Sequence, residues 1–190
     1  MTIKFLAGVD EVGRGCLAGP VMSAAIILNK KIDRSLLVDS KTISHNKRCK
    51  LADYIISNSY SIGIGIATNF EIDNLNIHNA TLLSMKRAIE NLSVKPSLVY
   101  VDGIFAPETG IKSRCFVKGD SKIPEISAAS IVAKVIRDNE MIYLDRRARV
   151  YNFYKNKGYP TKDHKMALER FGPSIYHRQS FSPICDMMAT

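Results

Sequence analysis

The segment from Ile3 to Val9 is almost continuously apolar and ends in two adjacent carboxylates, Asp10 and Glu11. An apolar run of this length is typical of a buried strand. Two ionised carboxylates about 4 Å apart repel one another by roughly 4 kcal/mol at an effective dielectric constant near 20. Such a pair therefore binds a cation, accepts a proton or lies open to water. Only one of the two can share the inner face of the strand, so we expect the glycine-rich bend at 13–15 to turn the other inwards. We predict a divalent-metal site at this strand end.

Composition indicates a globular protein whose partner carries negative charge. The 190 residues are 46% apolar and 24% charged, which suits one hydrophobic core and is short for two ordinary domains. The net charge of +9 favours a phosphate-bearing partner, either nucleic acid or an anionic membrane surface. The alternative is that the charge has no such partner, since many soluble proteins are basic. From residue 141 onwards nine Lys and Arg residues outnumber four acids, and aromatic residues lie among them. That mixture favours nucleic-acid contact.

The cysteines and the apolar stretches exclude several other classes of protein. The four cysteines, at 16, 49, 115 and 185, show no paired spacing, which argues against a zinc site and against a disulfide framework. The apolar segment before Asp10 is too short for a signal-peptide core. No stretch approaches the roughly 20 apolar residues that span a bilayer. We expect a reduced, cytoplasmic protein with no membrane partner, and a monomer as the default state.

Hydrophobic periodicity predicts a mixed α/β domain. The predicted strands are 3–9, 20–28, 60–66, 98–101 and 115–117, and the predicted helices are 46–58, 74–92 and 125–149. The first three strands have short or polar connections, which suggests an antiparallel group, whereas the later alternation of strand and helix implies parallel strands. We expect one domain over 1–190, with 150–190 as a basic helical and loop appendage.

Two further acids resemble Asp10 and Glu11 in their setting. Asp102 and Asp120 each follow an apolar strand closely and adjoin a glycine. Ligands of α/β sheets bind beyond the carboxyl ends of the strands, so the four carboxylates are candidates for one site. Oxygen ligands without Cys or His favour Mg²⁺ or Mn²⁺ over zinc, and two such ions suit phosphodiester cleavage. The alternative for Asp102 and Asp120 is an ordinary Asp-Gly or Gly-Asp turn.

Several other residues are candidates for substrate contact. Gly13-Arg14-Gly15 permits close approach of the backbone to a sugar-phosphate chain, and its spacing to Gly19 does not match the dinucleotide-binding fingerprint. Ser40 and Lys41 either contact phosphate or form a solvated turn. Tyr159, between a glycine and a proline, either stacks on a sugar or base or packs in the core.

Some charged residues of the second half have a plainer interpretation as well. His164 and His177 lie in the basic segment and either touch phosphate or stabilise loops. Lys134 and Asp138 are four residues apart on the long helix, which most simply gives a surface ion pair of small energetic value. A place for Asp138 near the metal centre is the alternative.

Taken together, these motifs resemble the ribonuclease HII family, in family order over nearly the whole chain. The matching segments are 7–15 (Ala-Gly-Val-Asp-Glu-Val-Gly-Arg-Gly), 17–21, 39–41 (Asp-Ser-Lys), 101–103 (Val-Asp-Gly), 117–121, 125–135 (Glu-Ile-Ser-Ala-Ala-Ser-Ile-Val-Ala-Lys-Val), 158–161 and 177–181. The Asp-Glu-x-Gly-Arg-Gly and Ser-Ala-Ala-Ser-Ile-x-Ala-Lys blocks are highly specific. Thr42 stands where the family usually has a second lysine.

The resemblance implies a ribonuclease H-like fold, with a five-stranded mixed sheet of three antiparallel and then two parallel strands, flanked by helices. It implies an endonuclease that cuts the RNA strand of RNA/DNA hybrids and incises duplex DNA at embedded ribonucleotides, leaving a 5′-phosphate and a 3′-hydroxyl. Asp10, Glu11, Asp102 and Asp120 match the metal-binding catalytic acids. Gly13, Arg14 and Gly15 match the loop that recognises the 2′-hydroxyl, and Tyr159 matches the tyrosine that stacks on the adjoining deoxyribose.

Two other functions remain open from the residues themselves. A nucleic-acid-binding module without catalysis would tolerate loss of Asp102 or Asp120 and would be indifferent to chelators. A metal-dependent phosphoesterase of small substrates would depend on ionic strength much less than a protein that binds duplex through several phosphates.

Overall fold

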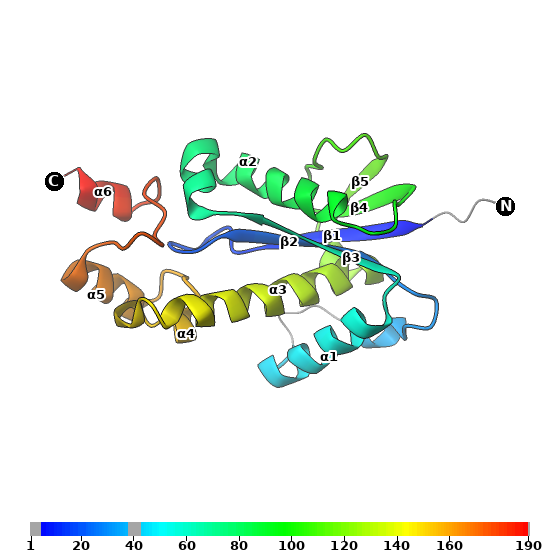
Figure 1. Ribbon diagram of the computed structural model, residues 1–190, viewed down its shortest axis with the longest axis horizontal. Helices are drawn as coiled ribbons and strands as arrows, with labels where there is room; N and C mark the ends of the chain where they lie inside the picture. The colour runs from blue at the N-terminus through cyan, green and yellow to red at the C-terminus, as the bar shows by residue number, and fades with distance from the viewer. Residues whose placement is uncertain (1–4, 38–42, 190) are drawn as a thin grey trace.

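The computed structural model describes residues 5–37 and 43–189, and its centre is a five-stranded mixed sheet (Figure 1). The strands are β1 (Leu6–Val12), β2 (Val21–Ile27), β3 (Ser61–Ala67), β4 (Leu98–Asp102) and β5 (Ser113–Phe116). Their spatial order is β3-β2-β1-β4-β5. β1, β2 and β3 pair antiparallel, whereas β4 and β5 extend the sheet in parallel from β1. The predicted topology of three antiparallel and two parallel strands is confirmed.

Helices cover both faces of the sheet. The α-helices are α1 (His45–Asn58), α2 (Asn69–Glu90), α3 (Pro124–Asp145), α4 (Phe153–Asn156), α5 (Lys162–Phe171) and α6 (Ile184–Met188), and the 3₁₀ helices are η1 (Arg34–Leu36), η2 (Gly119–Ser121) and η3 (Arg149–Tyr151). Figure 1 shows α2 on one face of the sheet and α3, backed by α1, on the other, with α4, α5 and α6 at one end. In the part of the chain that the structure describes, no helix is long and apolar enough to cross a membrane.

The helix α2 begins five residues earlier than the periodicity predicted. Its start is set by a capping box, in which the Thr68 hydroxyl accepts from the Glu71 amide and the Glu71 carboxylate accepts from the Thr68 amide. The backbone departs from helical geometry at Asn76, where φ is 67°. Because this kink breaks the helical spacing, periodicity predicted a start at residue 74, just before the kink, and missed the first turn that begins at Asn69.

The helix α3 lies against the strand that carries Asp10 and Glu11. Nearly all of its first half is buried, including Ala128, Ile131 and Val132, whose spacing puts them on one side of the helix. The helix approaches β1 so closely at Gly8 that a Cβ there would overlap the backbone of Glu125. Glycine at this position therefore brings the first turns of α3 against the sheet beside Asp10.

The strand β1 is longer than predicted, and this corrects one expectation about the acids. Asp10 and Glu11 lie inside β1, paired with Ala24 and Ser23, rather than at a strand end. The glycine-rich bend begins only after Val12, so it does not turn either carboxylate. Continued strand pairing fixes both side chains instead.

The C-terminal segments pack on the end of α3 through a separate hydrophobic cluster. Its buried members are Leu17, Ala18, Met141, Leu144, Tyr151, Phe153, Leu168 and Ile184. The helix α5 starts at an N-cap, where the Thr161 hydroxyl accepts from the His164 amide. This packing places the bend that carries Tyr159 beside α3.

Candidate active site

Three carboxylates face a common cavity at one edge of the sheet. The cavity has a volume of about 190 Å³ and is lined by Asp10, Glu11, Val12, Arg48, Asp102, Ser130, Lys134 and Tyr159. The parallel register that pairs Val9 with Val101 sets Asp10 level with Asp102 on neighbouring strands. The topology of the sheet therefore joins acids that are about half the chain apart in sequence.

Asp10 is the most deeply buried of the three, with 5% of its surface exposed. Burial raises the pKa of this carboxyl well above its usual value, and the charges of Glu11 and Asp102 raise it further. Hydrogen bonds from the Ser130 hydroxyl and from the Glu11 amide, at 2.7 Å, lower the pKa in part. An ionised Asp10 is thus costly in this environment unless a cation is close.

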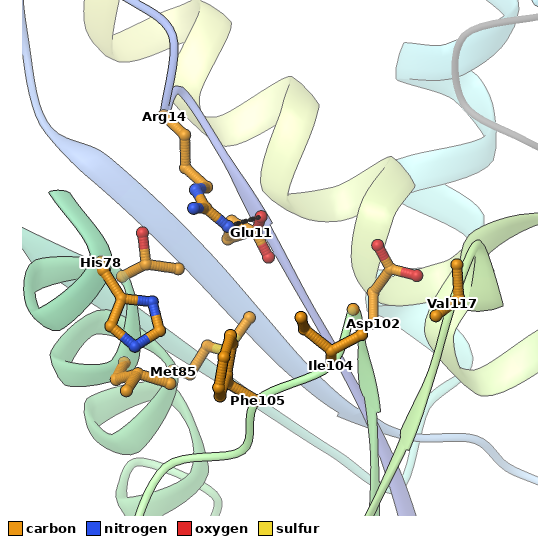
Figure 2. A pocket seen from close by; sticks show the side chains of 11 residues that line it. Glu11, Arg14, His78, Met85, Asp102, Ile104, Phe105 and Val117 are labelled. Atoms are coloured by element: carbon orange, nitrogen blue, oxygen red, sulfur yellow. Dashed lines mark ion pairs between the residues drawn. The ribbon is translucent and has the colours of Figure 1, made fainter.

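Glu11 lies between the carboxylate cavity and an arginine of the following bend. Burial raises the pKa of Glu11, the charge of Arg14 lowers it, and the charge of Asp102 raises it. The Arg14 guanidinium pairs with the Glu11 carboxylate at 3.6 Å, as Figure 2 shows. Arg14 therefore compensates part of the negative charge of this cluster.

Asp102 and Asp120 are placed differently. Asp102 Oδ1 accepts a hydrogen bond from the Gly119 amide at 2.6 Å, so the end of β4 is tied to η2. Asp120, the next residue in η2, has 5% of its surface exposed and does not line the cavity. The structure brings Asp10, Glu11 and Asp102 together and leaves Asp120 outside the lining of this cavity.

The donor chemistry of the cavity suits a hard divalent cation. Within residues 5–37 and 43–189, no three side chains of the Asp, Glu, His or Cys type stand close enough to hold a metal ion as they are placed. However, the acids that line the cavity offer only oxygen atoms and repel one another, as the raised pKa values of Asp10 and Glu11 indicate. Oxygen donors of this kind are preferred by Mg²⁺ and Mn²⁺.

A second, mostly apolar cavity of about 210 Å³ adjoins the first. It shares Glu11 and Asp102 with the carboxylate cavity and is lined by Glu11, Arg14, His78, Thr81, Leu82, Met85, Asp102, Gly103, Ile104, Phe105 and Val117 (Figure 2). The His78 and Phe105 rings meet edge to face with centroids 4.7 Å apart. The acids therefore stand between a polar pocket and an apolar one, an arrangement that suits a long substrate with both charged and apolar surfaces.

Tyr159 closes the opposite side of the carboxylate cavity. Its side chain is partly buried, and burial raises the pKa of its hydroxyl to about 12, so the phenol is neutral at physiological pH. The Lys134 ammonium lies 5.5 Å from the centroid of its ring. One face of a neutral aromatic ring and a cation thus border the acids.

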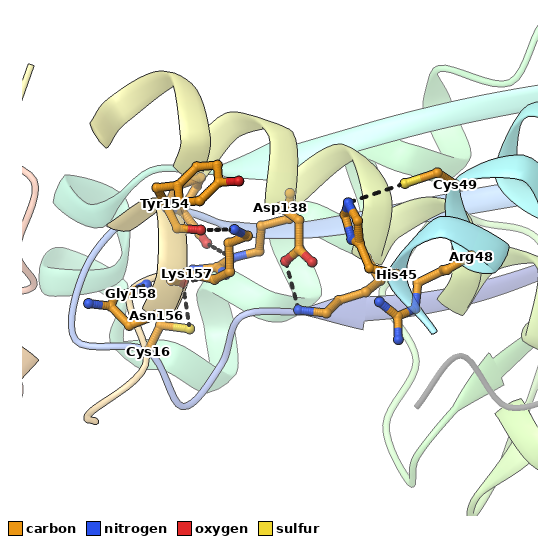
Figure 3. Close-up of polar contacts among 12 residues, drawn as sticks. Cys16, His45, Arg48, Cys49, Asp138, Tyr154, Asn156, Lys157 and Gly158 are labelled. Carbon is orange, nitrogen blue, oxygen red and sulfur yellow. Dashed lines mark hydrogen bonds and ion pairs between the residues drawn. The ribbon is translucent and has the colours of Figure 1, made fainter. Parts of the chain in front are cut away.

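Lys134 is held by Asp138, and this pair is not the surface pair that its spacing suggested. The Lys134 ammonium lies 2.7 Å from Asp138 Oδ1, and only 4% of Asp138 is exposed. Figure 3 shows the carboxylate of Asp138 with this contact. Since Lys134 lines the carboxylate cavity and Asp138 does not, Asp138 acts on the cavity through the lysine.

The loop at 13–15 and the two histidines complete the surroundings. Arg14 and Gly15 are exposed, whereas Gly13 is buried with φ at 95°. His164 and His177 are buried and contact each other, so of the two alternatives stabilisation of loops is the one their placement supports. Ser40 and Lys41 lie outside the described residues.

Sequence reasoning missed several residues that shape the site. Ser130, which bonds Asp10, lies within the Ser-Ala-Ala-Ser block that matches the family, but it was not among the candidate site residues. Arg137 and Arg178 are both 0% exposed and bond backbone carbonyls of the loop after β1. Nothing in the local pattern distinguishes a buried arginine from a solvated one. Arg178 lies in the matching segment 177–181, but that match gave it no role, and no sequence signal pointed to Arg137.

Comparison with known proteins finds one family. The model of the family "Ribonuclease HII" matches residues 7–183. Ribonuclease HII of Pelagibacter ubique (strain HTCC1062) is 51% identical over 187 residues, which cover 98% of this chain and 100% of that protein. The crystal structure of ribonuclease H2 from Pyrococcus horikoshii OT3 aligns with a TM-score of 0.81 and 24% identity, covering 97% of each chain. A structure of Bst-RNase HIII in complex with Mn²⁺ aligns with a TM-score of 0.75 and 17% identity, covering 98% of this chain and 70% of that one.

Proposed function

This chain belongs to the ribonuclease HII family and is an endonuclease that hydrolyses phosphodiester bonds, and from that premise we propose its substrate and its catalytic residues. The substrates are RNA/DNA hybrids, cut in the RNA strand, and duplex DNA that contains ribonucleotides. The products carry a 5′-phosphate and a 3′-hydroxyl. The observation that carries this proposal is the cavity shared by Asp10, Glu11 and Asp102.

We propose that Asp10, Glu11 and Asp102 hold Mg²⁺ or Mn²⁺, with Asp120 as a fourth acid. The mutual repulsion of the carboxylates and their exclusively oxygen donors support a hard divalent ion. The chemistry that such ions supply, when bound, is activation of the attacking water and stabilisation of the leaving oxygen. Asp120 is the candidate for this place because it follows Gly119, whose amide bonds Asp102.

The remaining residues of the site bind and orient the substrate strand. Lys134, fixed by Asp138, supplies a cation for a phosphate beside the acids. Gly13, Arg14 and Gly15 contact the 2′-hydroxyl, which alone distinguishes ribose from deoxyribose. Tyr159 stacks on the neighbouring deoxyribose, and Ser40 and Lys41 contact phosphate. We further propose that residues 1–190 act as one domain, in which 150–190 add basic surface for the duplex.

The experiment that tests this function is cleavage of a DNA duplex with one central ribonucleotide. We expect a single cut beside the ribonucleotide with Mg²⁺ or Mn²⁺, no cut with chelator, and no cut of the matched all-DNA duplex. The ends are identified by mass spectrometry. Binding without any cut under all metal conditions would contradict the proposal and favour a binding module. Equal turnover of a small phosphodiester, with weak dependence on salt, would favour a small-substrate phosphoesterase.

A further inference from the structure

Two wholly buried arginines lie beneath the loop that follows β1. Arg137 comes from α3, Arg178 comes from the segment before α6, and both are 0% exposed. Among the described residues, neither guanidinium forms an ion pair with a carboxylate. Burial lowers the pKa of Arg178 to about 10, so it still carries its charge at neutral pH. Each charge is stabilised by backbone carbonyl groups instead.

Arg178 uses its guanidinium to bind three carbonyls of the loop. Its Nη2 donates to the Gly13 carbonyl at 2.7 Å, its Nη1 to the Arg14 carbonyl at 2.8 Å, and its Nε to the Gly19 carbonyl at 3.0 Å. Arg137 binds a different set, donating to the carbonyls of Ala18, Pro20 and Lys157. Of the two arginines, it is Arg178 that holds the peptides at 13 and 14.

This arrangement fixes the direction of two amide groups. In a trans peptide the N–H points away from the C=O of the same unit. Because the carbonyls of Gly13 and Arg14 point inwards to Arg178, the amides of Arg14 and Gly15 point outwards from it. Both residues are exposed, and neither amide donates to another group within the described part of the chain.

The loop geometry depends on the same contacts. Gly13 has φ at 95°, and a Cβ at this position would overlap the Arg137 side chain. At Gly15 a Cβ would meet no atom within 4 Å, so the space outside the loop is open. Successive outward amides above two buried positive charges favour an oxygen acceptor or an anion. The side of the loop away from Arg178 is thus prepared for an oxygen atom of the substrate.

We propose that Arg178 is a positioning residue for ribonucleotide recognition, because it holds the Arg14 and Gly15 amides towards the sugar of the substrate strand. This inference rests on the proposed function. Arg178 does not touch the substrate. It acts through the Gly13–Arg14 and Arg14–Gly15 peptide groups. Their orientation decides whether both amides can donate hydrogen bonds to one hydroxyl.

The test compares two dissociation constants, one for a duplex with a single ribonucleotide and one for the matched all-DNA duplex. Both are measured with Mg²⁺ in an Asp102→Asn background, so that the substrate is not consumed. We expect the parent to prefer the ribonucleotide duplex by about tenfold or more, the effect of one good hydrogen bond. Arg178→Lys retains the charge but not the planar fork, and we expect its preference to fall below about threefold.

The matched control for loss of stability is Leu168→Ala. Leu168 is buried in the hydrophobic cluster at the end of α3, and its apolar side chain cannot hydrogen-bond to the carbonyls that Arg178 binds. We expect this variant to melt at a lower temperature and to retain the preference of the parent. A purely structural role of Arg178 would give the same pattern for both variants. Retention of the preference in Arg178→Lys would overturn the inference, and so would its loss in Leu168→Ala.

A second pair of variants keeps the inference testable if Arg178→Lys does not fold. Gly15→Pro removes one outward amide, and the matched control is Lys86→Gln, at an exposed ion pair on α2. We expect loss of the preference in Gly15→Pro and a retained preference in Lys86→Gln. An unchanged preference in Gly15→Pro would refute the role of the amide. If the unaltered chain fails to cut either substrate, the proposed function fails, whereas a chain that cuts normally but ignores these substitutions refutes only this inference.

Discussion

Asp102 Oδ1 accepts a hydrogen bond from the Gly119 amide at 2.6 Å, which joins the last residue of β4 to the 3₁₀ helix that carries Asp120. Asparagine at 102 still offers an oxygen to this amide, so Asp102→Asn should fold normally. Loss of a group that hydrogen-bonds a metal ligand typically costs about 10–100-fold, and loss of a charged ligand itself should cost at least about 100-fold. We expect a fall of that size in the cleavage rate, measured in a single-turnover assay.

Asp120→Asn separates the fourth acid from the other three. Asp120 is buried but lies outside the carboxylate cavity, so the change tests whether it joins the site during the reaction. We expect a fall in rate smaller than that of Asp102→Asn, with an unchanged dissociation constant for the duplex. A rate within about twofold of the unaltered chain would assign Asp120 a structural role only.

Asp10→Asn should stabilise the protein in the absence of metal and slow cleavage strongly. The raised pKa of Asp10 means that its ionised form is disfavoured in the folded state, so above the usual pKa of an aspartate this group lowers the stability of the fold. A neutral amide removes that cost. We expect a melting temperature a few degrees higher in chelator at pH 7.5, with the difference reduced or reversed when Mg²⁺ is added. A lower melting temperature in chelator would show that repulsion at Asp10 is not significant.

The pair of His164 and His177 should make the fold sensitive to mild acid. Their Nε2 atoms lie 3.0 Å apart, His164 Nδ1 contacts the Tyr159 carbonyl, and the Ser174 amide donates to His177 Nδ1. These three hydrogen bonds are all satisfied when the two rings share one proton between their Nε2 atoms and His164 Nδ1 carries another. Both histidines are then neutral. Burial is the main cause that lowers the pKa of both, that of His177 to about 4.

Proton linkage determines whether the free energy of unfolding rises or falls with pH. A histidine with a lowered pKa in the folded state contributes fully above its unfolded pKa of about 6.5 and loses that contribution as the pH falls towards 4. We expect a loss of roughly 2–3 kcal/mol of unfolding free energy over this window from His177. Urea denaturation of the unaltered chain and of His177→Asn, at several pH values, measures it. Parallel pH profiles for the two proteins would contradict the assignment.

Lys134→Gln tests whether the lysine beside the acids contacts phosphate. Lys134 lines the carboxylate cavity, and removal of a phosphate contact should reduce the salt dependence of duplex binding by about one unit of slope. We expect a several-fold weaker affinity at moderate salt. The control is Lys86→Gln, since Lys86 forms an exposed pair with Glu90 on α2. Equal salt slopes for Lys134→Gln and the unaltered chain would remove Lys134 from the binding site.

The acids on the strands are the part of the site that the sequence predicts best. Asp102 was placed correctly because an apolar run ends beside it and because parallel strands bring their carboxyl ends together. Glu11 was a candidate because it adjoins Asp10. The expectation that the bend at 13–15 turns one of these carboxylates inwards was wrong, because β1 stays paired with β2 through Val12. Sequence alone does not reveal how far a ladder of hydrogen bonds continues.

The unpredictable part depends on contacts between distant segments. Arg137 bonds carbonyls 117 and 119 residues earlier in the chain, and Arg178 bonds one that is 165 residues earlier. Asp138 and Lys134 have the spacing of a surface pair, yet the C-terminal segments bury the carboxylate. Burial of these groups is decided by what packs over them, which hydrophobic periodicity does not encode.

The central claim is that Asp10 and Asp102 act as one catalytic unit, and a double-mutant cycle on the cleavage rate tests it most directly. Single-turnover rates on the duplex with one ribonucleotide are measured for Asp10→Asn, Asp102→Asn and the double variant. Residues of one unit are strongly non-additive, so we predict a double variant within about tenfold of the slower single variant. A double variant whose loss equals the product of the two single losses would show two independent contributions and contradict the account.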